Sequence, residues 1–265
     1  SGSHVTDSGQ SLRKFSLNMP QMALTGLGEP WLFKEVGDIH WAMITAFLKS
    51  PSSAIKDEMG DRLYATFTRF QIEVTPSLRG FRENDTFEIA SSLERFGASM
   101  FFGTHDVTSA NASCRARTMS TFAKYGERGA NTSLIKGAPL IDTPDRLPSL
   151  DRFPEFGTEY RARRAQDPAE TLFECEYEIL PPHDINGVGL LYFASYPSVF
   201  DLYREQRPAI LCEFRADRDP DLQVACPGRR RQSCAAHSLS VPRERREANG
   251  RSGERQTALR QYPEI

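Results

Sequence analysis

One segment whose residue types could do chemistry is Gly37-Asp38-Ile39-His40-Trp41. An imidazole such as that of His40 can donate or carry a proton near neutral pH. A histidine inside an apolar helical stripe is also commonly a hydrogen-bonded core residue, so both roles stay open for His40. Asp38 is expected to open a helix, where its carboxylate can accept hydrogen bonds from free backbone N–H groups.

A second candidate is Tyr64, in a run of alternating residues over Leu63–Val74. A phenol can act as an acid, a hydrogen-bond donor or a nucleophile, but it is a weak nucleophile because an unperturbed phenol has a pKa of about 10. Tyrosine and threonine are also favoured in strands for packing reasons alone. Chemistry at Tyr64 would therefore need a cationic or hydrogen-bonding neighbour.

The third candidate is the turn His183-Asp184-Ile185-Asn186-Gly187. Aspartate, asparagine and glycine all tolerate turn geometry, so a plain turn explains them. In a functional interpretation, Asn186 or backbone N–H groups would stabilise a carbonyl oxygen as negative charge develops on it.

Motifs for other chemistries are missing from the sequence. It contains no GxGxxG, P-loop, GxSxG or HExxH pattern. The net charge of −2 and pI near 6.2 argue against a whole-chain nucleic-acid or membrane-surface binder. No apolar run approaches the roughly 20 residues that a bilayer requires, and we expect no secretory signal.

The five cysteines are odd in number and form no CxxC pair. We therefore expect neither a disulfide framework nor a metal site, but small buried thiols in a cytoplasmic protein. The cysteines are Cys114, Cys175, Cys212, Cys226 and Cys234.

Hydrophobic periodicity predicts the helices and strands on which these candidate residues lie. Apolar side chains at helical spacing predict a helix over Val36–Phe47, ended by Pro51. Strand-like runs follow it at Leu63–Val74, Thr86–Ser92, Ser99–Thr108 and Ala112–Tyr125. A later strand is predicted over Thr171–Ile179, a helix interrupted by Pro197 over Gly189–Glu205, and a strand over Ala209–Phe214.

An internal repeat at an offset of 161 residues suggests two similar units. Pro20, Gly26 and Gly28 match Pro181, Gly187 and Gly189, each in a Pro/Gly loop that feeds a helix. We predict a flexible tail over 1–16, a first unit over 17–150, a linker over 151–169, a partial second unit over 170–227, and a basic, disordered tail over 228–265. Residues 228–262 hold nine Arg against three Glu and few large apolar side chains, so no packed strands are expected there.

Three segments together carry a family resemblance. They are Asn18–Leu32 with its Pro/Gly loop, Gly37-Asp38-Ile39-His40-Trp41 followed by Tyr64-Ala65-Thr66-Phe67, and Asp184–Pro197. In combination they resemble the biosynthetic double-hotdog family typified by the leinamycin-pathway acyltransferase/decarboxylase, over roughly residues 17–215. The resemblance implies an α+β fold of two hotdog units, each an antiparallel sheet around a central helix.

The resemblance also implies a function. A (methyl)malonyl-type group would pass from coenzyme A to an acyl carrier protein with decarboxylation, in polyketide-type biosynthesis. Tyr64 maps onto the family's reactive tyrosine, with His40 and Asn186 polarising the thioester carbonyl. Glu29, Trp31, Thr66 and Gly187 are the expected substrate-binding residues. No metal or redox cofactor is expected, and a homodimer is one assembly that the resemblance allows. The basic segment after about residue 226 departs from the family, which would continue there with strands.

Two alternatives stay open. A hotdog dehydratase or thioesterase would need a histidine or carboxylate as base, with His40, Glu29 or Asp184 as candidates. A non-catalytic module that binds acyl groups or carrier proteins would use the same pocket without turnover.

Overall fold

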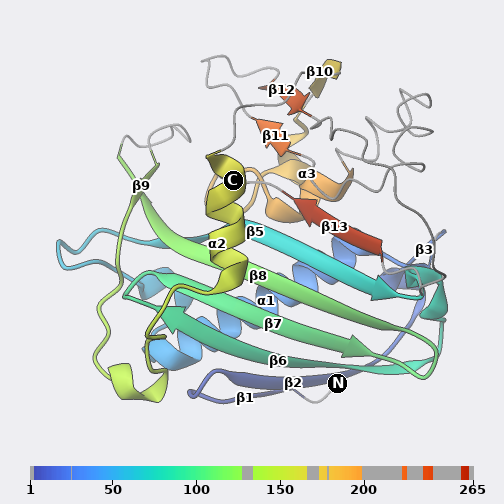
Figure 1. The fold of residues 1–265 in the computed structure, drawn as a ribbon, viewed down its shortest axis with the longest axis horizontal. Coiled ribbons are helices and arrows are strands. Elements are labelled where there is room, and N and C mark those ends of the chain that lie inside the picture. Colours follow the sequence, from blue (N-terminus) through green and yellow to red (C-terminus); the bar gives the residue numbers. More distant parts are fainter. Residues whose placement is uncertain are drawn as a thin grey trace, which may run out of the picture.

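The protein is described by a computed structural model covering residues 3–24, 26–126, 134–165, 173–177 and 179–198, with three further strands at 223–225, 235–240 and 258–262. Its centre is an antiparallel sheet on one long helix, α1 (Glu29–Leu48), which lies across one face of the sheet (Figure 1). This is the helix-in-sheet architecture of one hotdog unit, as the resemblance implies.

Helix α1 forms where the apolar spacing predicts it, but it begins at Glu29 rather than near Val36. Pro30 fits the first turn, where its missing N–H is not needed. The helix ends at Leu48, and the left-handed backbone of the next residue, Lys49 (φ 50°), breaks the helical pattern just before Pro51. Asp38 therefore lies in the middle of the helix. The expectation that it caps the helix start is wrong, because at this position the backbone N–H groups are already bonded within the helix.

The sheet has the strand order β1-β2-β6-β7-β8-β5-β13, so the strands before and after α1 flank a meander of three hairpin-linked strands. The predicted strands are confirmed as β5 (Tyr64–Thr75), β6 (Thr86–Phe96), β7 (Met100–Thr108) and β8 (Ser113–Tyr125). A bulge between Phe67 and Arg69 breaks the expected strict alternation along β5. As a result Phe67 and Phe70 both belong to the buried core on the α1 side of the sheet.

Residues 3–16 of the predicted flexible tail over 1–16 form strands. They form β1 (Ser3–Val5) and β2 (Gln10–Ser16), and β2 pairs with β6 along its full length. In β2 the more buried residues Ser11, Arg13 and Phe15 alternate with exposed ones. A strand with only one buried face can look polar in sequence, which is why these residues resembled a tail.

Residues 151–169 are not simply a linker either. They contain α2 (Glu155–Arg164), which lies across the face of the sheet opposite α1 (Figure 1). Phe156 is buried there against Phe102 and Met119. Arg69, 3% exposed, donates a hydrogen bond to the carbonyl of Phe156 and pairs with Glu159 at 3.0 Å. The few apolar residues of this segment suffice because they meet an apolar patch on the sheet.

Several short elements connect these parts. They are η1 (Met19–Gln21), β3 (Met22–Ala23), β4 (Gly26–Leu27), η2 (Ser52–Ala54), η3 (Leu78–Gly80), β9 (Leu134–Lys136) and η5 (Pro144–Arg146).

The predicted second unit is described only in part. It includes β10 (Phe173–Tyr177), which confirms the strand expected there, α3 (Pro181–Asp184) and η6 (Phe193–Ser195). Both copies of the repeat start with a helical turn at a proline and continue into a tight pair, Met22↔Leu27 in one and Ile185↔Leu191 in the other. The helix predicted over Gly189–Glu205 does not begin at Gly189, because residues 189–192 form a bend and the bridge of Leu191 to Ile185; helical structure starts at Phe193 and is described to residue 198. The rest of that helix and the strand over Ala209–Phe214 lie outside the described residues.

Strands occur in the basic C-terminal region, contrary to expectation. β12 (Ala235–Ser240) pairs with β10 and with β11 (Gln223–Ala225), and β13 (Ala258–Tyr262) pairs with β5. The edge of a sheet offers unpaired backbone N–H and C=O groups, so a segment can join it through its main chain without an apolar sequence. Among the described helices, none is long and apolar enough to cross a membrane.

Candidate functional site

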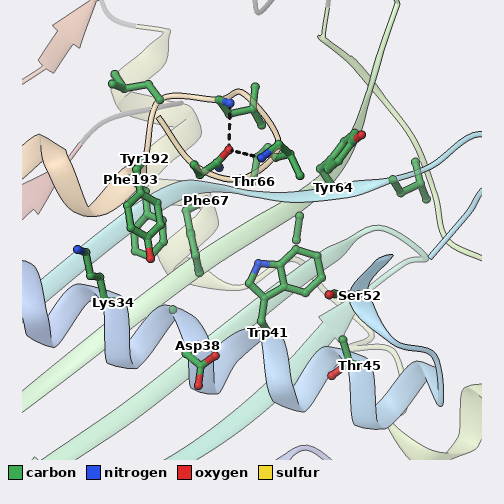
Figure 2. Close-up of a pocket in the computed structure, with 18 of the residues that line it drawn as sticks. Lys34, Asp38, Trp41, Thr45, Ser52, Tyr64, Thr66, Phe67, Tyr192 and Phe193 are labelled. Atoms are coloured by element: carbon green, nitrogen blue, oxygen red, sulfur yellow. Dashed lines mark hydrogen bonds between the residues drawn. The ribbon is translucent and has the colours of Figure 1, made fainter. Parts of the chain in front are cut away.

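A cavity of about 550 Å³ lies between α1, the start of β5 and the segment 186–193 (Figure 2). Its size falls within the range typical of small-molecule sites. The residues that line it are Lys34, Gly37, Asp38, Trp41, Ala42, Thr45, Ser52, Arg62, Leu63, Tyr64, Ala65, Thr66, Phe67, Asn186, Gly187, Val188, Leu190, Leu191, Tyr192 and Phe193.

Helix α1 supplies one wall through side chains that recur at three- and four-residue spacing. Lys34, Asp38, Trp41 and Thr45 fall on one face of the helix and all reach the cavity. Asp38 is the only carboxylate among the described residues that line it.

The Asp38 carboxylate is held from outside the cavity. Its Oδ2 accepts an ion pair from Arg13 Nη1 at 2.8 Å, and the same guanidinium pairs with Glu35 at 2.6 Å. Burial alone would lower the pKa of Arg13, but the hydrogen bonds to Asp38 and Glu35 outweigh it and raise this pKa. The Asp38 side chain is 68% exposed, so water can reach the carboxylate.

Strand β5 supplies the opposite wall. The Tyr64 ring lies edge-on to Tyr125 at 5.6 Å, and the Arg62 guanidinium lies 5.0 Å from its centroid. The ring borders the cavity, whereas the hydroxyl points away from Asp38 and Trp41 (Figure 2). Thr66 is buried and donates its hydroxyl to the Thr121 carbonyl at 3.2 Å.

The segment 186–193 closes the cavity. Asn186 Oδ1 accepts hydrogen bonds from the N–H groups of Val188 (3.1 Å) and Leu190 (3.0 Å), so this oxygen holds the turn together. Tyr125 donates its hydroxyl to the Val188 carbonyl at 2.9 Å, which ties the turn to β8. The amide nitrogen of Asn186 donates no hydrogen bond to any described residue and is therefore free to serve a ligand.

Phe193 docks this segment onto α1 at Gly37. A Cβ at position 37 would lie 2.3 Å from Phe193 Cζ, so only glycine lets the ring approach the helix so closely. The ring also contacts Phe67 at a centroid distance of 4.7 Å. The width of the cavity therefore depends on the Gly37–Phe193 contact.

His40 is not part of this cavity. It is 0% exposed, and hydrogen bonds join its Nε2 to Ser120 Oγ at 2.8 Å and its Nδ1 to Thr118 Oγ1 at 3.0 Å. Thr118 also contacts His105 Nε2 at 3.3 Å, and His105 Nδ1 contacts Ser91 Oγ at 2.9 Å. These five residues form a buried chain, here called the histidine chain.

Both histidines of this chain are held neutral. Burial, reinforced by the neighbouring His105, lowers the pKa of His40 well below its usual value. Burial lowers the pKa of His105 to about 3. His40 thus has the surroundings of a hydrogen-bonded core residue, the alternative that its place in the apolar stripe left open.

The remaining expected site residues divide into two groups. Tyr64, Thr66, Asn186 and Gly187 are brought together around the cavity. Glu29 is buried at the start of α1, and Trp31 packs edge-on against Phe15 and Phe87, so neither lines the cavity. Asp184, a candidate base, is buried and accepts a hydrogen bond from the Leu180 N–H at 2.8 Å.

Sequence reasoning missed Asp38 as a cavity residue, together with Trp41 and Thr45. The signal was present, since Lys34, Asp38, Trp41 and Thr45 follow helical spacing. The predicted helix began too late in the sequence, so Lys34 was left out of this spacing and Asp38 was interpreted as a helix cap. In the described parts of the chain, no three His, Cys, Asp or Glu side chains gather closely enough to hold a metal ion.

Comparisons with known proteins give similar structures only. The sequence matches no family model and no curated protein. An acyl-ACP thioesterase from Bacteroides thetaiotaomicron is similar at 10% identity and a TM-score of 0.49, over 88% of this chain and 98% of that one. A 1,4-dihydroxy-2-naphthoyl-CoA thioesterase from Synechocystis is similar at 13% identity and a TM-score of 0.39, over 50% of this chain and 90% of that one. A hypothetical thioesterase with coenzyme A from Streptococcus pneumoniae gives 10% identity and a TM-score of 0.36, over 46% and 85%.

Proposed function

We propose that this protein hydrolyses acyl thioesters of coenzyme A or acyl carrier protein, with Asp38 as the general base. The observation that carries the proposal is the place of Asp38, since it is the one carboxylate among the described residues that line the cavity. A thioester carbonyl needs only an activated water and a stabilised oxyanion to be hydrolysed.

Each step can be assigned to a group in the cavity. Oδ1 of Asp38, which pairs with no described residue, takes a proton from water as the water oxygen attacks the thioester carbon, while Arg13 holds Oδ2. The amide nitrogen of Asn186, which bonds to no described residue, is the donor for the carbonyl oxygen. When the tetrahedral intermediate collapses, the C–S bond breaks and the thiolate leaves as a thiol, taking back the proton from Asp38.

The charges around the cavity suit such a substrate. Lys34 and Arg62 are exposed at its border, where they can meet the phosphates of coenzyme A or of a carrier's pantetheine arm. Lys34 Nζ lies 5.4 Å from the ring centroid of Tyr192, a residue of the segment that closes the cavity. The repeat supports the further proposal that residues 170–227 belong to a second hotdog unit.

The decisive test compares two carboxylates that share Arg13. Asp38→Asn removes the base, so hydrolysis of acyl-coenzyme A should fall about 10²–10⁴-fold. Glu35→Gln is the matched control, because Glu35 also pairs with Arg13 but does not line the cavity. It should keep activity within a few-fold. Equal losses in both variants would show that the ion-pair cluster matters and not a base at position 38.

The second candidate is acyl transfer with decarboxylation, in which Tyr64 forms an acyl ester and passes the group to a carrier protein. It is favoured by the place of the Tyr64 ring on the cavity wall, in a strand that resembles the double-hotdog family. Tyr64→Phe distinguishes the two. Under hydrolysis the variant keeps most of its activity and releases free acid. Under transfer, product falls by orders of magnitude and the adduct on the intact protein, seen by mass spectrometry, disappears.

A further inference from the structure

Aromatic rings border the cavity from all three elements that form it. Trp41 comes from α1, Tyr64 and Phe67 come from β5, and Tyr192 and Phe193 come from the closing segment. In Figure 2 these labelled rings surround the open space, with Trp41 on the helix side and the Phe193 and Tyr192 pair at one end. A flat group placed there would have a ring near it on more than one side.

The rings are held in place by packing outside the cavity. Trp41 lies edge-on to Phe122 at 6.1 Å, and Tyr64 lies edge-on to Tyr125 at 5.6 Å. Phe193 is fixed by Phe67. Rings that are already oriented lose little freedom when a ligand binds, so their preference for aromatic partners is expressed in affinity.

Building on the proposed hydrolysis, we propose that the acyl group is aromatic, an aroyl thioester, and that Phe193 is a specificity-determining residue. An aromatic ring gains edge-to-face or offset contacts with these rings that a saturated ring of the same size cannot make. Phe193 sets the width of the cavity because Gly37, which has no side chain, allows the ring to lie directly on helix α1.

Tryptophan fluorescence reports binding without catalysis. The chain has two tryptophans, and Trp31 lies outside the cavity against Phe15 and Phe87. Trp31→Phe therefore leaves Trp41 as a single reporter on the cavity wall. The ligands are phenacyl-coenzyme A and its cyclohexyl counterpart, in which a methylene between sulfur and carbonyl prevents hydrolysis.

The aromatic ligand should bind about 2- to 10-fold more tightly than the saturated one, the effect of one aromatic pair. Phe193→Leu in the same background should remove most of this preference. Phe153→Leu is the matched control, because Phe153 is also a half-buried ring but packs against Phe96 and Phe102 on the other face of the sheet. It should keep the preference.

Two results would overturn the inference. One is equal or tighter binding of the cyclohexyl ligand to the Trp31→Phe protein, a comparison that needs no change in the cavity. The other is a preference that survives Phe193→Leu in a folded protein. Failure of the proposed function looks different, since the aromatic preference in binding would then persist while no acyl-coenzyme A is hydrolysed.

Discussion

The cavity and the histidine chain each include a polar residue of helix α1. They differ in whether the polar atoms of that residue are all bonded within the protein. Asp38 and His40 are two residues apart on α1. Asp38 lines the cavity and is 68% exposed, and among the described residues only Arg13 binds its carboxylate, through Oδ2. His40 is fully buried, and both of its ring nitrogens are bound within the protein.

The comparison shows why residue type alone is a poor guide to chemistry. An imidazole is the side chain best suited to proton transfer near neutral pH, yet here burial keeps it neutral and its hydrogen bonds are all used. A carboxylate that lines a cavity and is reached by water can act as a general base. Variants in the histidine chain should therefore change stability, and variants in the cavity should change activity.

The largest stability effect is expected for His40→Ala. The change leaves a cavity in the core and deprives the hydroxyls of Thr118 and Ser120 of a partner, so it should cost about 3–5 kcal/mol in the free energy of unfolding. Asp38→Asn should change this free energy by about 0.5 kcal/mol or less. Urea unfolding of both variants measures it. A His40 variant that is as stable as wild type but inactive would place the imidazole in the catalytic machinery.

Acid should destabilise the histidine chain in a defined pH window. The folded-state pKa of His105, about 3, lies below the unfolded value of about 6.5, so the unfolded chain takes up the proton first. The stability from neutral His105 is complete above about pH 6.5 and is lost as the pH falls toward 3, at about 1.4 kcal/mol per pH unit. His40 is shifted in the same direction and adds to the loss.

Denaturant unfolding at pH 7, 6 and 5 measures this loss. In His105→Gln the slope of unfolding free energy against pH should be shallower than in wild type by about one proton. Carboxylates titrate in both proteins, so they cancel from the difference. Identical slopes would mean that His105 is protonated to the same extent in the folded and unfolded states.

Alanine substitutions at two glycines, one in each region, should affect stability and substrate affinity differently. A Cβ at Gly103 would lie 2.4–2.7 Å from Thr118 Oγ1, His105 Nε2 and His40 Nδ1, so Gly103→Ala should cost about 1–3 kcal/mol by overpacking the histidine chain. The three atoms nearest to a Cβ at Gly37 all belong to the half-buried ring of Phe193, and alanine favours a helix by about 0.5–1 kcal/mol. Gly37→Ala should thus keep most of its stability and mainly change substrate affinity. Thermal melts and KM values on both variants check this, and the reverse pattern would contradict it.

The smallest effect is expected at one end of the histidine chain. Among the described residues the Ser91 hydroxyl bonds only to His105 Nδ1, so Ser91→Ala should cost about 1 kcal/mol. Thr118→Val removes a partner from both histidines and should cost about twice as much. Chemical denaturation of the two variants gives the ratio. Equal costs would show that the two bonds of Thr118 do not contribute separately.

Elements with strong local patterns were predictable from the amino-acid sequence alone. The periodic apolar side chains of Val36–Phe47 and the alternating runs from Leu63 to Tyr125 predicted the central helix and four of its strands, because burial of one face leaves a repeat in the sequence. The same patterns predicted that Tyr64 and Thr66 lie on one strand and that Asn186 and Gly187 lie in one turn.

Other elements depend on contacts between segments that lie far apart in the chain. Strands β1 and β2 and helix α2 are polar in sequence and are stabilised by partners far along the chain, such as β6 for β2 and Arg69 for α2. Whether His40 or Asp38 meets the cavity depends on which side of α1 the sheet covers and where the segment 186–193 docks. Burial and access to water arise from contacts distant in sequence, so no local pattern contains them.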